Sequence, residues 1–425
     1  AAGERVEHGR ARALKPNYLM VGLVFLIFFA ISLLTNILGP LIPDIIKGFS
    51  LSLGMAGFLP FAFFIAYGVM SIPSGMLVER YREKVVIAAA FSVAFVGSLA
   101  FALFPNFAVG LPSLFLIGIG MAMLQVAINP LLRVAGGEKQ FAFFSVAAQL
   151  VFGLASFISP QIYSYLVGRL GGEGSRDGNA IVAALARVVP PELPWISMYW
   201  VFMVVTAVMV AIVLVTRFPR VELTESERAG AWATHRALLR NPHVLLYALG
   251  IFCYVGAEQG IANWISQFLS SYHGFDPQTT GATAVGRFWL LMTIGCLLGL
   301  VLLKLMDSRT VLKIAAAAAM ATLAVAQFGP AGVALYAFPF IGFCLSVMWS
   351  IIFALALNSV AEHHGSFSGI LCTAIIGGAI APLVVGWLGD RVGLRYAMLF
   401  LYLPLGYILS IGFWSRPLVN NETVI

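Results

Sequence analysis

The chain has 425 residues, of which 60% are hydrophobic and only 10% are charged, and its mean hydropathy is +0.95. Soluble domains carry about 25% charged residues, so this composition excludes an ordinary soluble protein. The net charge of +7 does not indicate nucleic-acid binding, because the basic residues gather in loops of one parity. The four cysteines lie in apolar segments and the six histidines lack metal-ligand spacing. We therefore expect no disulfide, no metal and no cofactor.

Apolar runs of about 20 to 30 residues follow one another along the chain, each long enough to cross a bilayer as an α-helix. Charges or turn residues separate them, as at Glu79–Lys84 and Gly329–Pro330. The pattern predicts an all-α integral membrane protein with twelve transmembrane helices. The predicted spans are 18–43, 54–78, 84–104, 107–134, 141–168, 195–217, 244–269, 283–306, 310–328, 331–358, 367–389 and 394–415.

Lys and Arg residues are concentrated in the loops and tails of one side, which the positive-inside rule identifies as cytoplasmic. Both termini are then cytoplasmic, and a charged central loop divides the spans six and six. We expect a monomeric multi-pass protein of the plasma membrane, of the bacterial inner-membrane type. The expected divisions are a cytoplasmic tail (1–17), a first six-helix half (18–218), a cytoplasmic central loop (219–241), a second half (242–416) and a cytoplasmic tail (417–425).

Glu258 lies near the middle of the predicted span 244–269, and no other acidic residue falls at such a depth in a predicted span. A carboxylate there is costly, so it is expected to face a protein interior or a water-filled cavity on a substrate or ion pathway. Gln259, Asn263 and Gln267 follow at helical spacing and predict a polar face on that helix. Hydrogen bonding between packed helices is the alternative explanation for these amides.

The two halves share a short motif at equivalent places. Ser156–Pro160 in the fifth predicted span resembles Gly378–Pro382 in the eleventh. Such internal similarity is typical of transporters whose halves rock around a site at the membrane midplane.

Four motifs, in chain order, resemble those of one family of membrane proteins. They are Ala62–Tyr67 with Ser71–Gly75, Leu124–Pro130 (Leu-Gln-Val-Ala-Ile-Asn-Pro), Tyr254–Glu258 (Tyr-Val-Gly-Ala-Glu) and Ile375–Pro382 (Ile-Ile-Gly-Gly-Ala-Ile-Ala-Pro). With the six-plus-six organisation, they resemble the fucose and glucose/galactose permease family of the major facilitator superfamily, whose members are sugar:cation symporters. The resemblance implies two pseudo-symmetric six-helix halves, a small-molecule sugar as partner and no enzymatic activity. The implied substrate is a hexose of the glucose, galactose, mannose or fucose type.

Two departures from the family pattern concern the coupling ion, H⁺ or Na⁺, that the resemblance implies. The acid usual in the first span is replaced by Gly39, close to Asn36, and the arginine usual in the eighth span is missing, although Arg287 lies earlier in that span. Glu258 is then the candidate coupling residue, as a proton carrier or paired with Arg287 or a cation. The missing acid leaves a sugar uniporter as an alternative.

Amide side chains match the hydroxyls of a hexose, because each offers two donors and two acceptor lone pairs. An aromatic ring can cover the apolar face of the sugar, and Trp349, in the middle of its span, is the best candidate. An exporter of drugs or other small molecules is a further alternative, which would need a more apolar pocket. The expected substrate-binding residues are Asn36, Gln125, Asn129, Gln149, Glu258, Gln259, Asn263, Gln267 and Trp349.

Overall fold

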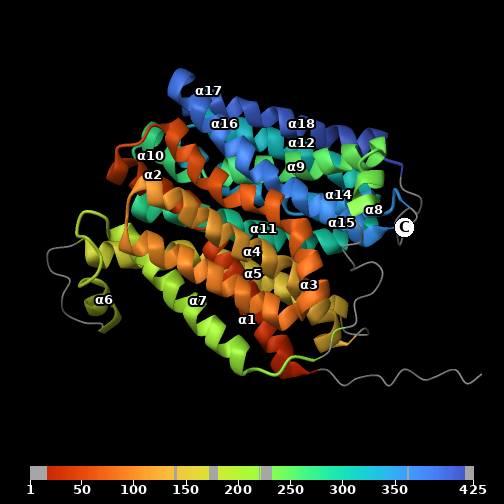
Figure 1. Ribbon diagram of the computed structural model, residues 1–425. Coiled ribbons are helices and arrows are strands. Elements are labelled where there is room, and N and C mark those ends of the chain that lie inside the picture. Colours follow the sequence, from red (N-terminus) through yellow and green to blue (C-terminus); the bar gives the residue numbers. More distant parts are fainter. Residues whose placement is uncertain are drawn as a thin grey trace, which may run out of the picture.

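The structure is a computed structural model that describes residues 17–137, 141–171, 180–219, 221, 232–360 and 363–416. These residues form a bundle of helices without strands (Figure 1). The predicted cytoplasmic tails and much of the predicted central loop lie outside the described residues, at 1–16, 222–231 and 417–425.

The helices of the first half cover most of residues 18–215. They are α1 (Tyr18–Thr35), α2 (Leu38–Phe49), α3 (Leu53–Leu103), α4 (Phe107–Gly136), α5 (Phe141–Leu170), α6 (Ala180–Leu185) and α7 (Ser197–Val215), with the 3-10 turn η2 (Pro194–Ile196) before α7. The short helix α8 (Trp232–Leu238) follows in the predicted central loop.

The helices of the second half cover residues 242–414. They are α9 (Pro242–Ala262), α10 (Ile265–His273), α11 (Ala282–Leu305), α12 (Ser308–Phe328), α13 (Ala331–Leu345), α14 (Met348–Leu357), α15 (His364–Thr373), α16 (Gly377–Val392), α17 (Leu394–Ala397) and α18 (Tyr402–Trp414). Shorter turns connect some of them: the π-helical η3 (Pro277–Gly281) and the 3-10 turns η4 (Ala374–Ile376) and η5 (Met398–Leu401).

Polar residues just before the apolar runs start several helices. The Ser52 hydroxyl accepts a hydrogen bond from the Met55 amide at 3.2 Å, and the Asn106 side chain accepts one from the Val109 amide at 2.9 Å. Such caps satisfy amide groups that have no partner inside the helix. The sequence therefore indicates at which residue a helix begins, in addition to which segments are apolar enough to cross a membrane.

The helix α3 contains two of the predicted spans. A straight helix of its 51 residues would be about 77 Å long, whereas the apolar core of a bilayer is about 30 Å thick. Arg82 interrupts α3 with φ 67° and ψ 163°, and the chain turns there. Within the described residues, 11 helices are long and apolar enough to cross a membrane. Since α3 counts as one of them, the prediction of twelve crossings is confirmed.

Besides the spans 367–389 and 394–415, which the 3-10 turns η4 and η5 interrupt, three predicted spans are each broken into two helices by a two-residue turn. The breaks fall at Asn36-Ile37 between α1 and α2, at Asn263-Trp264 between α9 and α10, and at Ser346-Val347 between α13 and α14. Discontinuous helices leave backbone groups unpaired, and membrane proteins tolerate this only where those groups are buried in protein or line a cavity. The breaks therefore point to the middle of the bundle.

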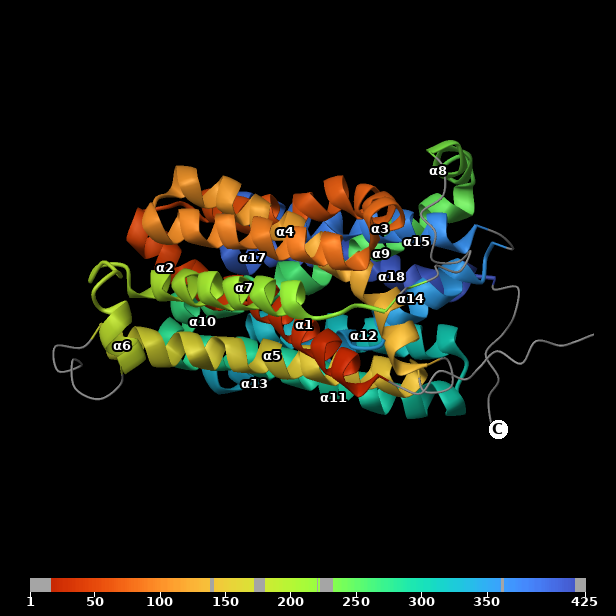
Figure 2. The same ribbon diagram turned by 60° about the horizontal axis from the view of Figure 1, so that its bottom comes forward.

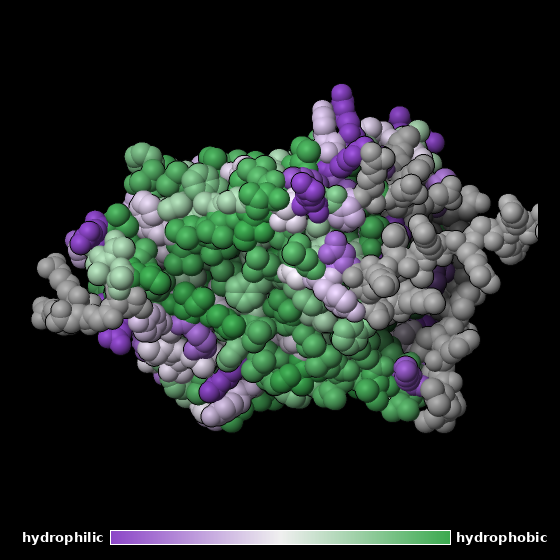
Figure 3. Space-filling view, turned by 90° about the horizontal axis from the view of Figure 1, so that it is seen from below, coloured by the Kyte–Doolittle hydropathy of each residue, from purple (hydrophilic) through white to green (hydrophobic). Residues whose placement is uncertain are grey.

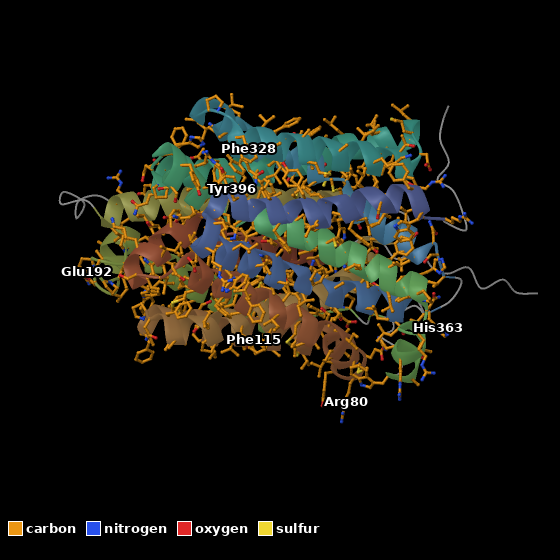
Figure 4. All side chains as sticks on the ribbon, turned by 90° about the horizontal axis from the view of Figure 1, so that it is seen from above. Arg80, Phe115, Glu192, Phe328, His363 and Tyr396 are labelled. Carbon is orange, nitrogen blue, oxygen red and sulfur yellow. The ribbon has the colours of Figure 1, made fainter. Side chains whose placement is uncertain are left out.

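The two halves lie side by side, with the first coloured red to yellow-green and the second green to blue (Figures 1 and 2). The main contacts between them are made by α3 with α16 and by α5 with α11. The described chain begins and ends at one end of the bundle, here named the tail end, where Arg80 and His363 also lie (Figures 1 and 4). Glu192 lies at the opposite end, here named the far end (Figure 4).

The face of the bundle in Figure 3 is apolar around its middle, and hydrophilic residues gather toward its two ends. Large apolar side chains such as Leu298, Leu403 and Phe413 are more than half exposed. An exposed apolar surface of this extent requires lipid as its solvent. The protein is therefore embedded in a bilayer, with the tail end on one side and the far end on the other.

Candidate functional site

A cavity of about 470 Å³ lies between the two halves, within the size range of small-molecule sites. Side chains from α1, α4 and α5 of the first half and from α9, α11 and α14 of the second line it. Asn36 and Glu258 line it in the middle of the bundle, and Ser145 and Leu303 line it near the tail-end termini of α5 and α11. The cavity therefore extends from the middle of the bundle to the tail end.

Polar contacts between the halves close the far end. Asp44 in α2 accepts a hydrogen bond from the Tyr163 hydroxyl of α5 at 2.6 Å. The same carboxylate accepts from the Gln278 amide of the second half at 3.1 and 3.2 Å. The Asp390 carboxylate of α16 accepts from the backbone amides of Leu53 and Gly54, which start α3, at 2.8 Å each. The bonds made by Gln278 and by Asp390 cross between the halves and would break if the halves separated at this end, whereas the Tyr163–Asp44 bond lies within the first half.

Close backbone contact seals the region between the cavity and the far end. A Cβ atom at Gly39 would collide with the carbonyl oxygen of Ala262, the last residue of α9. Only glycine therefore fits at this position while α2 and α9 touch. This contact gives a structural reason for glycine at a place where the resembling family carries an acid.

The first half supplies an amide-rich wall. Asn36, at the break between α1 and α2, donates a hydrogen bond to the Ser156 hydroxyl of α5 at 2.8 Å, and that hydroxyl lies 2.6 Å from the Ser32 hydroxyl. Gln125 of α4 and Gln149 of α5 also line the cavity. Within the described part of the chain, neither of these two amides has a hydrogen-bond partner, so both are available to a ligand.

The second half supplies a carboxylate beside aromatic rings. Glu258 of α9 is half-buried in the cavity wall and accepts a hydrogen bond from the Tyr254 hydroxyl at 3.0 Å. The Tyr254 ring lies 6.0 Å from the Trp349 ring, which stacks on Phe353 at 5.8 Å. No ion pair to Glu258 is found among the described residues. The carboxylate can therefore accept a hydrogen bond from a ligand or bind a cation without first breaking a salt bridge.

The helix α11 adds two further groups to the cavity. The Trp289 indole N–H is buried and has no partner among the described residues, although buried indole donors usually have one. Cys296 lies two turns further along, with its thiol donating to the Ser346 carbonyl at 3.2 Å. The free amides of the first half and the Glu258 acceptor of the second face the same space.

The cavity brings together six of the residues that the sequence singled out. These are Asn36, Gln125, Gln149, Glu258, Gln259 and Trp349. Four others do not line it: Asn129, Asn263, Gln267 and Arg287.

The break after α9 explains two of the four differences. The prediction assumed one continuous helix from Gln259 through Asn263 to Gln267. Instead, Asn263 lies at the break, where its amide donates to the Gln259 carbonyl and side-chain oxygens at 2.9 and 3.1 Å. Gln267 lies beyond the break, and its amide donates to Ser271 at 2.9 Å. Asn263 therefore holds Gln259 in place, and Gln267 belongs to the far end.

Asn129 and Arg287 lie on other faces of their helices. Asn129 is exposed outside the cavity lining. Arg287 is also exposed, with its guanidinium 5.9 Å from the centre of the Tyr336 ring. The pairing of Glu258 with Arg287, one of the alternatives considered from the sequence, is not made in this structure.

Sequence reasoning missed Asp44, which is 8% exposed within the candidate membrane span Tyr18–Phe49. The predicted first span stopped at residue 43, before this acid. In the sequence, the apolar residues Ile45 and Ile46 directly after Asp44 indicate that the helix continues past this acid. Asp44 is thus a further buried carboxylate, at the closed far end and outside the cavity lining.

The amino-acid sequence matches the family model of the Major Facilitator Superfamily over residues 24–375. The chain is 30% identical over 401 residues to a glucose/galactose transporter of Brucella abortus biovar 1 (strain 9-941), covering 91% of this chain and 92% of that protein. It is 24% identical over 387 residues to an L-fucose-proton symporter of Escherichia coli (strain K12), covering 86% of each.

Solved structures show the same fold. A crystal structure of a Major Facilitator Superfamily transporter, FucP, in the outward conformation matches 93% of this chain and 98% of its own, with a TM-score of 0.65 and 22% identity. An inward-facing bacterial homologue of the human lysosomal transporter Spinster matches 93% of this chain and 96% of its own, with a TM-score of 0.73 and 17% identity.

Two six-helix halves around a central cavity, together with the family match, define a membrane transporter of the major facilitator class and not an enzyme. Within that superfamily, the chain belongs to the fucose and glucose/galactose permease family.

Proposed function

We propose that this protein transports a hexose of the glucose, galactose, mannose or fucose type across a bacterial plasma membrane by alternating access, as an ion-coupled symporter. The observation that carries the proposal is the composition of the cavity wall. Amides without protein partners, a carboxylate without an ion pair and an aromatic surface face one space of about 470 Å³. The names of the relatives, a glucose/galactose transporter and a fucose-proton symporter, support the same substrate class.

The chemistry of the wall suits a polyol better than an apolar drug. Each hexose hydroxyl donates and accepts one or more hydrogen bonds, and Gln125 and Gln149 can do both in return. Glu258 accepts from a hydroxyl. Trp349 offers a flat apolar surface to the C–H face of the ring. A carboxylate and unsatisfied amides would be left unpaired by an apolar ligand, which disfavours an exporter of such compounds.

Charge distribution assigns the tail end to the cytoplasm in this proposal. Arg80 and His363 lie at the tail end (Figure 4), and the basic residues that set the predicted orientation flank the same ends of the crossings. The cavity reaches the tail end and the far end is closed, so the conformation is inward-facing. The higher TM-score to an inward-facing transporter than to an outward-facing one supports this assignment.

Glu258 is the coupling residue in this proposal. In the inward-facing form its carboxylate meets the cytoplasm through the cavity. Closing the tail end and opening the far end would expose the same group to the other side. A proton or a cation bound there would therefore move with the sugar.

Transport by purified protein in proteoliposomes tests the proposal. Wild-type protein should exchange radiolabelled hexose and concentrate it when a proton or sodium gradient is imposed, and an ionophore that removes the gradient should abolish the accumulation. Glu258→Gln keeps the shape and hydrogen bonding but removes the charge, so this variant should exchange sugar without concentrating it.

Three other outcomes would contradict parts of the proposal. Wild-type protein that exchanges no hexose would overturn the substrate class. Exchange without accumulation under any gradient would identify a uniporter, the alternative suggested by the missing acid in the first span. Accumulation by Glu258→Gln at the wild-type level would exclude Glu258 as the coupling group.

A further inference from the structure

A shallow groove runs along the outside of the second half, away from the cavity. Its floor is one face of α13, formed by Gly332, Val333, Tyr336, Ala337 and Phe340. Leu291 of α11 lines one side, and Ala321, Thr322 and Val325 of α12 line the other. Except for Thr322 and the Tyr336 hydroxyl, the side chains are apolar, and the groove is open to the outside along its length.

The groove begins near the far end and follows the direction of the bilayer normal. From Gly332 to Phe340 the floor extends about 12 Å at 1.5 Å per residue. One leaflet of the apolar core is about 15 Å thick. The groove therefore has the position and the length of an acyl chain in the leaflet at the far end.

Arg287 stands at the far-end mouth of the groove. It lies one turn before Leu291 on the same face of α11, and its guanidinium lies over the ring of Tyr336, a floor residue. Each residue is five positions, about 8 Å, from the start of its α-helix, and the helical turn η3 precedes α11 in the same crossing. A long arginine side chain at that depth reaches the headgroup region.

The charge of Arg287 is not balanced by the protein. No carboxylate pairs with it in the described part of the chain, although cations in membrane segments are normally paired or reach an anionic surface. Its contact with Tyr336 leaves the guanidinium N–H groups free for an oxyanion. An apolar groove with an unpaired cation at its headgroup end matches a lipid that carries a negative charge above an acyl chain.

We propose that this groove is a binding site for one phospholipid with an anionic headgroup, from the leaflet at the far end. The Arg287 guanidinium and the Tyr336 hydroxyl bind the headgroup phosphate, and an acyl chain lies over α13 between α11 and α12. The site is separate from the cavity, and the proposal does not depend on what the cavity binds.

Native mass spectrometry of the purified protein tests the site, with phosphatidylglycerol or zwitterionic phosphatidylcholine added at equal concentrations. Wild-type protein should retain phosphatidylglycerol preferentially. Arg287→Gln should weaken its retention roughly fivefold, because one basic residue near a membrane surface contributes about 1 kcal/mol toward anionic lipid. Arg391→Gln is the matched control, since Arg391 also lies over an aromatic ring, Trp387, but on α16, which does not line the groove.

Gly332→Leu tests the acyl-chain part independently. A Cβ at Gly332 would meet no atom within 4 Å, so the leucine side chain can enter the groove without disturbing the packing. This variant should lose lipid retention while its elution volume and melting temperature stay at the wild-type values.

Equal retention of the two lipids by wild-type protein, or unchanged phosphatidylglycerol retention in Arg287→Gln, would overturn the proposal. A dimer that forms in wild-type protein and dissociates in Gly332→Leu would show that a second copy of the chain covers the groove instead.

Discussion

At the residue scale, the cavity separates amides that are available to a ligand from amides that the protein already uses. Gln149 lines the cavity, is exposed to it and has no partner among the described residues. Asn263 and Gln267 have the same chemistry but donate to neighbouring protein oxygens. The difference lies in the helix break beside them. Amide type and spacing alone therefore identify candidates, and the hydrogen-bond partners decide between them.

Gln149→Ala should weaken hexose binding roughly fivefold, because a net hydrogen bond is worth about 1 kcal/mol. Isothermal titration calorimetry of the purified protein measures the change. Gln267→Ala is the matched control and should bind sugar at the wild-type level, since the Gln267 amide donates to Ser271 outside the cavity lining. Equal losses in both variants would mean that the effect is on folding and not on the site.

At the element scale, length and composition predicted the twelve crossings, because a run of about 20 apolar residues has few alternatives to a membrane helix. The breaks at Asn36, Asn263 and Ser346 could not be predicted in the same way. Each lies inside an apolar run without a proline at the break itself, and tertiary contacts such as the Asn36–Ser156 hydrogen bond stabilise it. A break changes the direction of every side chain after it, so site residues beyond a break, such as Gln267, were wrongly assigned to the cavity face.

Gly39→Ala tests whether the close contact of the broken helices matters. The added methyl group would collide with the Ala262 carbonyl oxygen, so α2 and α9 would have to separate. Overpacking of this kind typically costs about 1–3 kcal/mol. We expect a lower apparent melting temperature and slower sugar exchange.

Gly22→Ala in α1 is the control for that substitution. A Cβ at Gly22 would meet no atom within 4 Å, and alanine favours the helix by up to about 1 kcal/mol. Its melting temperature should equal or slightly exceed that of the wild type. If Gly39→Ala behaves in the same way, the contact with Ala262 does not hold the far end closed.

At the scale of the whole molecule, the far end is held shut by bonds that cross between the halves. Asp390 of the second half accepts from the first two amides of α3 in the first half, where the positive end of the helix dipole also favours a carboxylate. Gln278 of the second half donates to Asp44 of the first. These contacts exist only while the far end is closed, so they stabilise one of the two conformations that the proposed alternating-access mechanism requires.

Asp390→Asn should shift the equilibrium toward opening of the far end. Loss of the charge from partly exposed hydrogen bonds should cost about 1 kcal/mol, which is a roughly fivefold change in population. Spin labels at positions 192 and 396, in different halves, report the far-end separation by pulsed dipolar spectroscopy, and the longer distance should gain population. Asp307→Asn should leave the distances unchanged, because Asp307 pairs with Arg309 two residues away in the same half. Identical distance distributions in all three proteins would contradict a role for Asp390 in closure.

Because Cys296 lies in the cavity wall, its native thiol can be used to measure how accessible the cavity is. Of the four free cysteines, Cys253 and Cys344 are buried, whereas Cys296 is exposed and lines the cavity. A membrane-impermeant methanethiosulfonate should therefore inactivate sugar exchange when applied to inside-out vesicles, and hexose should slow the inactivation by occupying the same space. The Cys296→Ser variant should resist the reagent. The rate at which Cys296 is modified would then report, without an engineered label, how often the cavity opens to the cytoplasm. Equally fast inactivation of Cys296→Ser would show that another thiol is responsible.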